Sequence, residues 1–356
     1  MVPACWPTAS YHASGMDPAA RICNHCACMP TPLTDPFYRR IEYLRVSVTD
    51  RCDLRCTYCI PKGFSGFEEP AHWLTFDELE RVVRAFVELG VGRVRLTGGE
   101  PLSRGKLPDL AARLVQISGL DDLSVSTNGT RLRKLAVSLR QAGVARLNVS
   151  LDTLDPERFA AITGGGRLEQ VIDGLMAAAA AGFDPVKINM VVMKGVNDGE
   201  IFDMVNFCIR HGFTLRLIET MPMGSTGRDA TEHYMDLQEV RRALETQYEL
   251  IPAVMAGGGP ARYVRVGGTS LRIGFITPIS QHFCATCNRV RLAVDGTIYT
   301  CLGQEDKLEL RPLLRSGSSD EALKEAIRLA VSMKPERHEF VTQPQKIIRF
   351  MSATGG

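Results

Sequence analysis

Short strand-like runs alternate with helical patterns through most of this sequence, which leaves few folds open to it. Six runs rich in β-branched and apolar residues are predicted to be strands, at 43–50, 92–98, 121–129, 145–152, 186–193 and 214–220. Amphipathic patterns separate them, such as 75–90, where Thr75 and Glu78 have the spacing of a capping box and Gly90 ends the pattern. Repeated strand–helix units predict a parallel sheet with right-handed connections.

The number of strand–helix units and the lack of one motif indicate whether the sheet closes into a barrel. Six to eight such units without a GxGxxG opening favour a barrel-like closure over a doubly wound sheet. Functional groups in such barrels lie at the carboxyl ends of the strands. After residue 250, "IPAVMAGGGPARYVRV" leads through a Gly-rich turn into runs typical of antiparallel strands. We therefore predict an α/β fold with one region at 35–250 and a second at 251–356.

Composition excludes several classes of function. The 356 residues are 45% hydrophobic, and 42 Lys and Arg oppose 40 Asp and Glu, so the formal net charge is only +2. That balance argues against nucleic acid or an anionic membrane as a partner. No apolar run reaches 18 residues, and residues 1–34, which lack the apolar core of a signal peptide, are predicted to be a disordered leader. We expect a soluble cytoplasmic protein.

Two sets of three cysteines are the strongest chemical signal. Eleven cysteines, an odd number, argue for metal ligation over a full disulfide framework. Three thiolates can be a zinc site lacking its fourth ligand, or can hold three irons of a 4Fe-4S cluster and leave the fourth iron open. Spacing alone leaves both alternatives. The first set, on the loop after the first predicted strand, is Cys52, Cys56 and Cys59; the second is Cys284, Cys287 and Cys301.

The first set and a glycine-rich turn together resemble the radical S-adenosylmethionine (SAM) superfamily. The array "CDLRCTYC" has an aromatic residue, Tyr58, before its last cysteine, and "TGGEP" (97–101) follows the second predicted strand. Alone, "TGGEP" would be read as a strand-to-helix turn. The resemblance implies a partial (β/α)6 TIM-like barrel, a 4Fe-4S cluster whose open iron binds SAM, and radical chemistry started by a 5'-deoxyadenosyl radical.

Further motifs are similar to those of the GTP 3',8-cyclase (MoaA) family of molybdenum cofactor biosynthesis. They are "LRVSVTDRCDLRC", "TCNRVRL", "KPERHEF" (334–340) and the terminal Gly355–Gly356, and the match runs from about residue 37 to the end. The resemblance implies that the C-terminal α+β extension carries a second 4Fe-4S cluster, where the guanine base docks. It also implies conversion of GTP to (8S)-3',8-cyclo-7,8-dihydroguanosine 5'-triphosphate, the first step of that pathway.

The same resemblance implies the residues that contact substrate and cofactor. A triphosphate needs a basic cradle, and no G-x-x-x-x-G-K-[ST] loop supplies one here. The implied GTP contacts are Arg45, Arg95, Ser126, Lys187, Arg216, Arg289 and Arg291, of which the last two are also implied in catalysis. The implied SAM contacts are Tyr58, Gly99, Ser150 and Met221. Taken singly, each cation reads equally well as a strand-end surface charge, and Ser150 and Met221 as core positions.

The expected partners are GTP, an electron donor such as flavodoxin or ferredoxin, and the next pathway enzyme, cyclic pyranopterin monophosphate synthase. The chain is expected to be a monomer or a homodimer. One alternative is a radical SAM enzyme with an auxiliary cluster that modifies a peptide or protein. An alternative from another class is a zinc-dependent structural or binding module.

Overall fold

A curved sheet of twelve strands organises the chain in this computed structural model, which describes residues 32–355. The strand order is β12-β11-β10-β1-β2-β3-β4-β5-β6-β9-β8-β7. The strands are β1 Tyr43–Ser47, β2 Arg93–Thr97, β3 Asp122–Thr127, β4 Arg146–Ser150, β5 Val186–Val192, β6 Thr214–Glu219, β7 Leu250–Ala253, β8 Arg262–Val266, β9 Arg272–Ile276, β10 Arg289–Leu292, β11 Thr297–Tyr299 and β12 Lys307–Glu309. All six predicted strands are confirmed, as β1 to β6.

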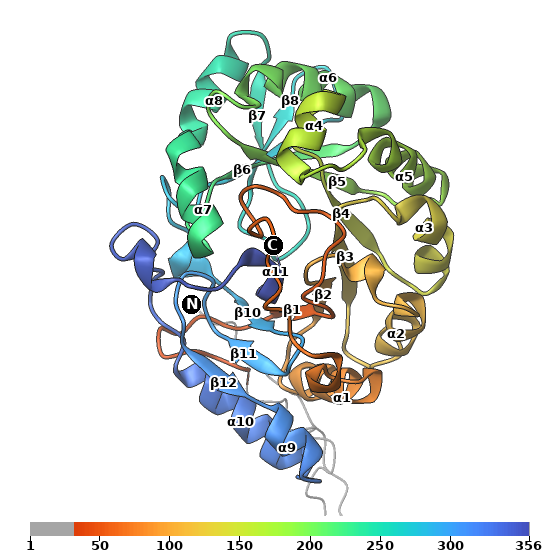
Figure 1. Ribbon diagram of the computed structural model, residues 1–356, viewed down its shortest axis with the longest axis vertical. Helices are drawn as coiled ribbons and strands as arrows, with labels where there is room; N and C mark the ends of the chain where they lie inside the picture. The colour runs from red at the N-terminus through yellow and green to blue at the C-terminus, as the bar shows by residue number, and fades with distance from the viewer. Residues whose placement is uncertain (1–31, 356) are drawn as a thin grey trace, which may run out of the picture.

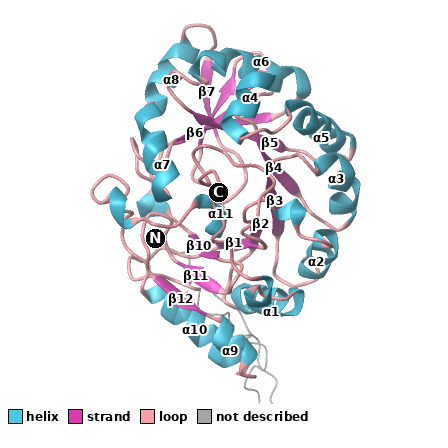
Figure 2. Ribbon diagram, in the orientation of Figure 1, coloured by secondary structure: helices cyan, strands magenta, loops and turns pink. Residues whose placement is uncertain are grey.

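Helices surround the outside of the arc formed by the strands, while loops and the C-terminus occupy its inside (Figures 1 and 2). The helices are α1 Phe76–Glu88, α2 Leu107–Leu114, α3 Leu132–Gln141, α4 Pro156–Thr163, α5 Leu168–Ala180, α6 Ile201–His211, α7 Gly224–Ala230, α8 Leu237–Glu245, α9 Arg311–Arg315, α10 Asp320–Ser332 and α11 Met351–Thr354. Helix α1 begins at the predicted capping box, in which Thr75 Oγ1 accepts from Glu78 N and Glu78 Oε2 accepts from Thr75 N.

The C-terminal region extends the same sheet from both sides. Strand β10 pairs in parallel with β1, and β9 pairs in parallel with β6, so eight neighbouring strands are parallel. The antiparallel strands expected after residue 250 are β7 and β8, which continue from β9, and β11 and β12, which continue from β10. The strand order is open at both ends, so the sheet forms a partial barrel. Strands from the chain beyond residue 250 extend it at both edges of the six strand–helix units.

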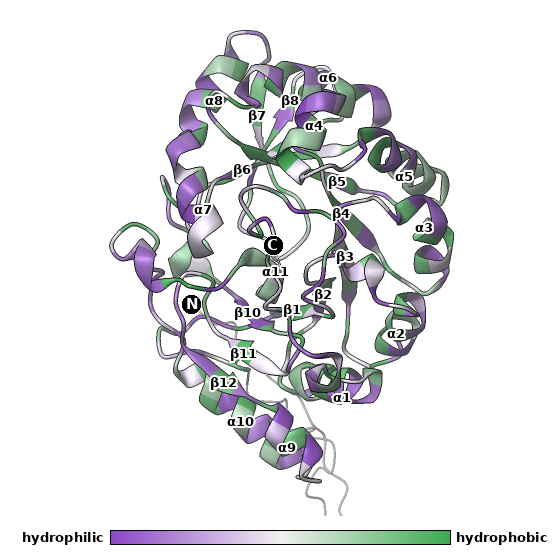
Figure 3. Ribbon diagram, in the orientation of Figure 1, coloured by the Kyte–Doolittle hydropathy of each residue, from purple (hydrophilic) through white to green (hydrophobic). Residues whose placement is uncertain are grey.

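Alternation along the strands separates the hydrophobic core from the inside of the arc. Leu44 and Val46 of β1 are fully buried in the main core, whereas Arg45 between them points to the other face. The surrounding helices carry both hydrophobic and hydrophilic residues along their length (Figure 3), as expected for helices with one face on the sheet. The inner face is therefore free to carry polar chemistry.

Residues just before the predicted boundary at residue 35 already pack against the rest of the structure. Leu33 is 4% exposed and its amide donates to the Leu89 carbonyl, and Thr34 forms a β-bridge with Arg40. The rest of the predicted leader lies outside the described residues. Within the described range, no helix has the length and apolar character needed to cross a bilayer.

Candidate active site

The first cysteine set lies on the loop that leaves the carboxyl end of β1. Cys52, Cys56 and Cys59 are all free thiols, and the Cys59 amide donates to the Cys56 carbonyl at 2.9 Å. Cys52 Sγ accepts from the Leu54 amide at 3.4 Å. Burial raises the pKa of Cys52 to about 11 and that of Cys59 to about 12. The thiols are therefore protonated until a metal binds and displaces the protons.

The turn "TGGEP" packs directly against this loop. The Gly99 amide donates to the Thr49 carbonyl at 2.8 Å, and the Glu100 amide donates to the Arg51 carbonyl at 2.8 Å. A Cβ atom on Gly99 would lie 2.4 Å from the Arg51 carbonyl oxygen, so only glycine permits this approach. The implied SAM contact at Gly99 stays a prediction, but the glycine already has a clear role in joining the two loops.

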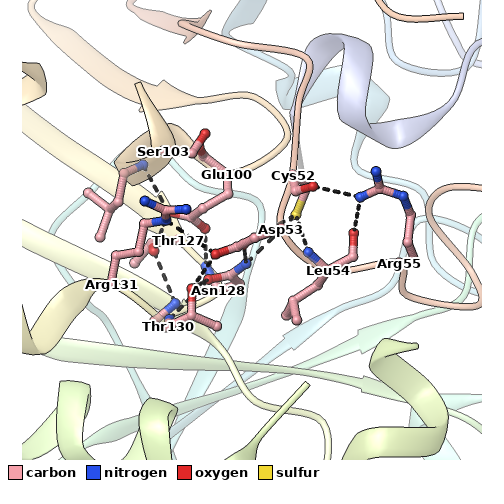
Figure 4. Close-up of polar contacts among 12 residues, drawn as sticks. Cys52, Asp53, Leu54, Arg55, Glu100, Ser103, Thr127, Asn128, Thr130 and Arg131 are labelled. Carbon is pink, nitrogen blue, oxygen red and sulfur yellow. Dashed lines mark hydrogen bonds and ion pairs between the residues drawn. The ribbon is translucent and has the colours of Figure 1, made fainter. Parts of the chain in front are cut away.

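A polar network ties the first cysteine set to β3 (Figure 4). Glu100 is fully buried, and its carboxylate accepts from the Leu102 amide, from Thr127 Oγ1 and from the Asn128 amide at 2.6–2.9 Å. Burial raises the pKa of Glu100 to about 7. Asn128 Nδ2 in turn donates to Asp53 at 2.7 Å and lies 3.7 Å from Cys52 Sγ. The motif contains Glu100, but Asn128 carries no sequence signal of its own.

Of the other implied SAM contacts, Ser150 and Met221 lie at and just after the carboxyl ends of β4 and β6, and Tyr58 lies on the loop after β1. Tyr58 Oη donates to Asp152 Oδ2 at 2.6 Å, and Asp152 Oδ1 accepts from the Val191 amide at 2.8 Å. Ser150 ends β4 with an exposed side chain, and Met221, just after β6, lines a cavity described below. Ser150 is thus not a core position, whereas Met221 packs against the small cluster of Met223, Phe340 and Ile347, and their contact with SAM stays a prediction.

The C-terminal segment lies against the first cysteine set. The amide of Ser352, in α11, donates to the Cys59 thiol. A Cβ atom on Gly355 would lie 2.3 Å from Thr97 Oγ1, at the start of "TGGEP". The last residue, Gly356, is outside the described range. The tail therefore reaches the inner side of the arc at the carboxyl end of β2, as Figure 1 shows.

The second cysteine set lines a cavity on the inner face of the sheet. Cys284 and Cys287 precede β10 and Cys301 follows β11, so the antiparallel pair β10–β11 brings the three together. All three are free thiols. For Cys287, burial alone would raise the pKa, but Lys334 and Arg289 outweigh it and lower the pKa to about 7. The local field thus favours the thiolate, which is the form that binds metal.

Five arginines line the same cavity. They are Arg45, Arg95, Arg216, Arg289 and Arg291. Register explains the grouping: Arg45 on β1 is directly opposite Arg95 on β2 and Arg291 on β10, so three guanidinium groups form one row across three parallel strands. The predicted strand for Arg289 and Arg291 is confirmed as β10, and both side chains face this cavity.

These cations lack acidic partners within residues 32–355. None of the ion pairs found there includes any of the five arginines or Lys187. Arg216 donates to Asn148 Oδ1 at 2.5 Å, while the Nε atoms of Arg45, Arg216, Arg289 and Arg291 are buried without an acceptor. Burial and then the neighbouring Arg291 lower the pKa of Arg45 well below its ordinary value. Buried charges are normally paired, so this arrangement indicates an anionic ligand.

Two of the implied GTP contacts do not line the cavity itself. Lys187 and Ser126 both pair in register with Asn148 of β4, and Lys187 is 6% exposed with its ammonium 5.8 Å from the centre of the Tyr263 ring. The Ser126 hydroxyl is buried without a hydrogen-bond partner. Ser126 on β3 and Lys187 on β5 therefore flank Asn148 of β4, one on each side.

The three free thiols of each cysteine set are the donor type that holds an iron–sulfur cluster. No group of three or more His, Cys, Asp or Glu side chains in the described part of the chain is close enough to hold one metal ion. Each thiolate of a 4Fe-4S cluster binds a different iron, so its ligands are spread more widely than those of zinc. Each set also has an N–H donor directed at a sulfur, from Leu54 to Cys52 and from Lys334 to Cys287.

Comparison with known proteins found a matching family model for the region that holds each cysteine set. The Radical SAM superfamily model matches residues 46–208, and the Molybdenum Cofactor Synthesis C model matches residues 213–340. A GTP 3',8-cyclase 2 of Pseudomonas aeruginosa is 50% identical over 331 residues, covering 91% of this chain and 98% of the relative. The chain belongs to the GTP 3',8-cyclase family.

Two further members of the GTP 3',8-cyclase family show the same extent of similarity. Those of Ectopseudomonas mendocina and Paracoccus denitrificans are 48% and 47% identical over 91% of this chain, which covers 98% and 96% of their lengths. The predicted family membership is thus confirmed over both cysteine sets.

Proposed function

We propose that this chain is a radical SAM enzyme that converts GTP to (8S)-3',8-cyclo-7,8-dihydroguanosine 5'-triphosphate, the first step of molybdenum cofactor biosynthesis. Membership of the GTP 3',8-cyclase family supports this assignment. One structural observation carries it further: five arginines that form no ion pair with any residue of 32–355 line a cavity whose wall also contains three free cysteines. Such a cavity suits a ligand with several negative charges and a base that can bind iron.

The two cysteine sets would hold the clusters. We assign the first 4Fe-4S cluster to Cys52, Cys56 and Cys59, and a second one to Cys284, Cys287 and Cys301. When bound, the first cluster and SAM supply a 5'-deoxyadenosyl radical, the species that starts the reaction. The Gly99 backbone, Tyr58, Ser150 and Met221 would orient SAM, since Gly99, Ser150 and Met221 lie at or just after the carboxyl ends of β2, β4 and β6 and Tyr58 lies on the loop after β1.

The arginines would hold and orient GTP. A guanidinium group can bind two phosphate oxygens at once through two N–H donors. The row Arg95–Arg45–Arg291 places three such groups side by side. Arg291, which ends this row, and Arg289 both lie on β10 and line the same cavity as the second cysteine set, so they would contact both the nucleotide and the reacting region. A ribose fixed between a bound base and a bound triphosphate is held for reaction at carbon 3' and carbon 8.

Lys187 should make GTP binding depend on pH. Burial and then Arg216 lower the pKa of Lys187 from its ordinary value to about 7. Above about pH 7, Lys187 has lost its proton in the ligand-free folded protein but keeps it in the unfolded chain. The free energy of unfolding should therefore rise with pH, up to the ordinary pKa of a lysine. GTP needs the charged ammonium, so its affinity should weaken as pH rises above about 7.

Titration of GTP into the wild-type chain and Lys187→Met from about pH 6 to about pH 9 tests this assignment. The variant should bind GTP more weakly at the acidic end and lose the part of the pH dependence that Lys187 supplies. Because GTP's own titration is common to both proteins, identical slopes would refute the role of Lys187.

An electron donor such as flavodoxin or ferredoxin and the next enzyme, cyclic pyranopterin monophosphate synthase, are the partners that this reaction calls for. We place the enzyme in the cytoplasm, where the reducing poise keeps thiols and low-potential carriers reduced. We propose no oligomeric state beyond a monomer or a homodimer.

Anaerobic incubation with reductant, SAM and GTP tests the proposal as a whole. The expected result is 5'-deoxyadenosine that forms in proportion to a cyclised GTP product. A chain that forms no such product when it carries about eight irons would not be a GTP 3',8-cyclase. Turnover of a peptide in place of GTP would favour the peptide-modifying alternative, and a colourless chain loaded with zinc would favour the structural one.

A further inference from the structure

Lys334 lies beside the second cysteine set but outside the cavity that the set lines. It follows α10, is 3% exposed, and is absent from the cavity wall. Its ammonium lies 3.6 Å from Cys287 Sγ and donates to the carbonyl oxygens of Arg289 and Thr300 at 3.0 and 2.5 Å. Its donors are directed at a sulfur and two backbone carbonyls, so Lys334 requires a different explanation from that of the five arginines.

The three acceptors around the Lys334 ammonium show which group can supply its negative counter-charge. An ammonium has three N–H donors, and here the three acceptors are two carbonyls and one sulfur. No ion pair within residues 32–355 includes Lys334. The Cys287 sulfur is therefore the one acceptor among these three that can carry a full negative charge. A buried ammonium without any anion would be costly, whereas one beside a thiolate is compensated.

Two other buried cations near the second set act differently. Arg39 donates to the Cys284 carbonyl at 2.9 Å and is paired with Asp35. Arg349 donates to the Leu302 carbonyl at 3.1 Å and is paired with Glu305. Both hold the backbone of the cysteine loops, and both have their charge balanced by a carboxylate. Lys334 alone of the three directs its charge at a sulfur.

We propose that Lys334 is a positioning residue for the second cluster, which holds the Cys287 thiolate by an N–H···S hydrogen bond and adds a fixed positive charge beside the cluster. The inference rests on the proposed second cluster. Hydrogen bonds to cluster sulfurs and nearby positive charge both stabilise the reduced, more negative state, so they raise the reduction potential. Lys334 would thereby tune the electronic properties of the substrate-binding cluster without touching the substrate.

The test compares Lys334→Met with the wild-type holoenzyme. Methionine has a similar length but neither the charge nor the donor hydrogens. Iron content and an EPR-monitored redox titration are measured on both, with and without GTP to identify the signal of the second cluster. Lys334→Gln, which retains an N–H donor without the charge, separates the two contributions. Lys324→Met is the matched control, because Lys324 in α10 carries the same charge but pairs with Glu88 and Glu321.

The expected result for Lys334→Met is a lower potential for the GTP-responsive signal alone, with a smaller shift in Lys334→Gln and none in Lys324→Met. Selective loss of about four irons in Lys334→Met, with the other cluster retained, would support the same holding role. Unchanged iron and an unchanged potential would overturn the proposal, even if thermal stability fell. A wild-type chain with only about four irons would instead remove the second cluster, and with it the proposed function.

Discussion

Replacement of Cys284 by serine should separate cofactor cleavage from GTP cyclisation. The first cysteine set is untouched, so the Cys284→Ser chain should still form 5'-deoxyadenosine from SAM under reducing conditions. The second cluster loses one of its three thiolates, so iron should fall from about eight to about four per chain. Without a docking point for the base, the ribose is no longer held for reaction, and cyclised product should fall by about 100-fold or more.

Cys208→Ser is the control for this experiment. Cys208 is a fully buried free thiol in α6 and belongs to neither set, so its replacement changes a core cysteine without changing a ligand. It should retain both clusters and full product formation. Product formation by Cys284→Ser at the wild-type rate would contradict the docking role of the second set. Loss of 5'-deoxyadenosine as well would show that the two sets do not act separately.

Replacement of Arg45 by methionine should weaken GTP binding and stabilise the ligand-free protein. Arg45 lies between Arg95 and Arg291 in one row, and no carboxylate in the described part of the chain pairs with it, so its removal relieves repulsion between like charges. Replacing an uncompensated charge by an apolar side chain should raise the free energy of unfolding by about 1 kcal/mol. Loss of one charged contact to phosphate should weaken GTP binding by about 10- to 100-fold.

The opposite signs of these two changes distinguish a ligand-binding arginine from a structural one. Arg146→Met is the comparison, because Arg146 of β4 forms an ion pair with Asp122 and does not line the cavity. Its loss should lower the free energy of unfolding and leave GTP affinity nearly unchanged. Denaturant unfolding and equilibrium GTP binding measure both quantities. If Arg45→Met were destabilised like Arg146→Met, the arginine row would be structural.

The strands of the parallel sheet could be predicted because their signal is local. Runs such as 92–98 and 214–220 combine β-branched residues with flanking turns, and each became a strand at nearly the predicted place. The partners of these strands could not be predicted in the same way. The pairing of β1 with β10 joins residues from opposite ends of the chain, such as Arg45 and Arg291, and this register has no local signature.

The site shows the same division. The cysteine spacing and "TGGEP" are short motifs, so the sequence alone indicates their chemistry. That the five arginines share one cavity depends on the curvature of the sheet and on register, and each arginine alone is equally consistent with a surface charge. Lys334 is part of the motif "KPERHEF", but no spacing relates it to Cys287, because the contact arises from the position of the segment after α10.

The pairing of β1 with β10 also has a consequence for synthesis on the ribosome. One edge of β1 stays without a partner until β10 (residues 289–292) has been made. One edge of β6 likewise stays without a partner until β9 has been made. Open parallel edges are sites of mispairing and aggregation. A nascent or truncated chain that ends near residue 250 would expose both edges at once, so residue 250 is not a place where the chain can be cut into independently folding parts.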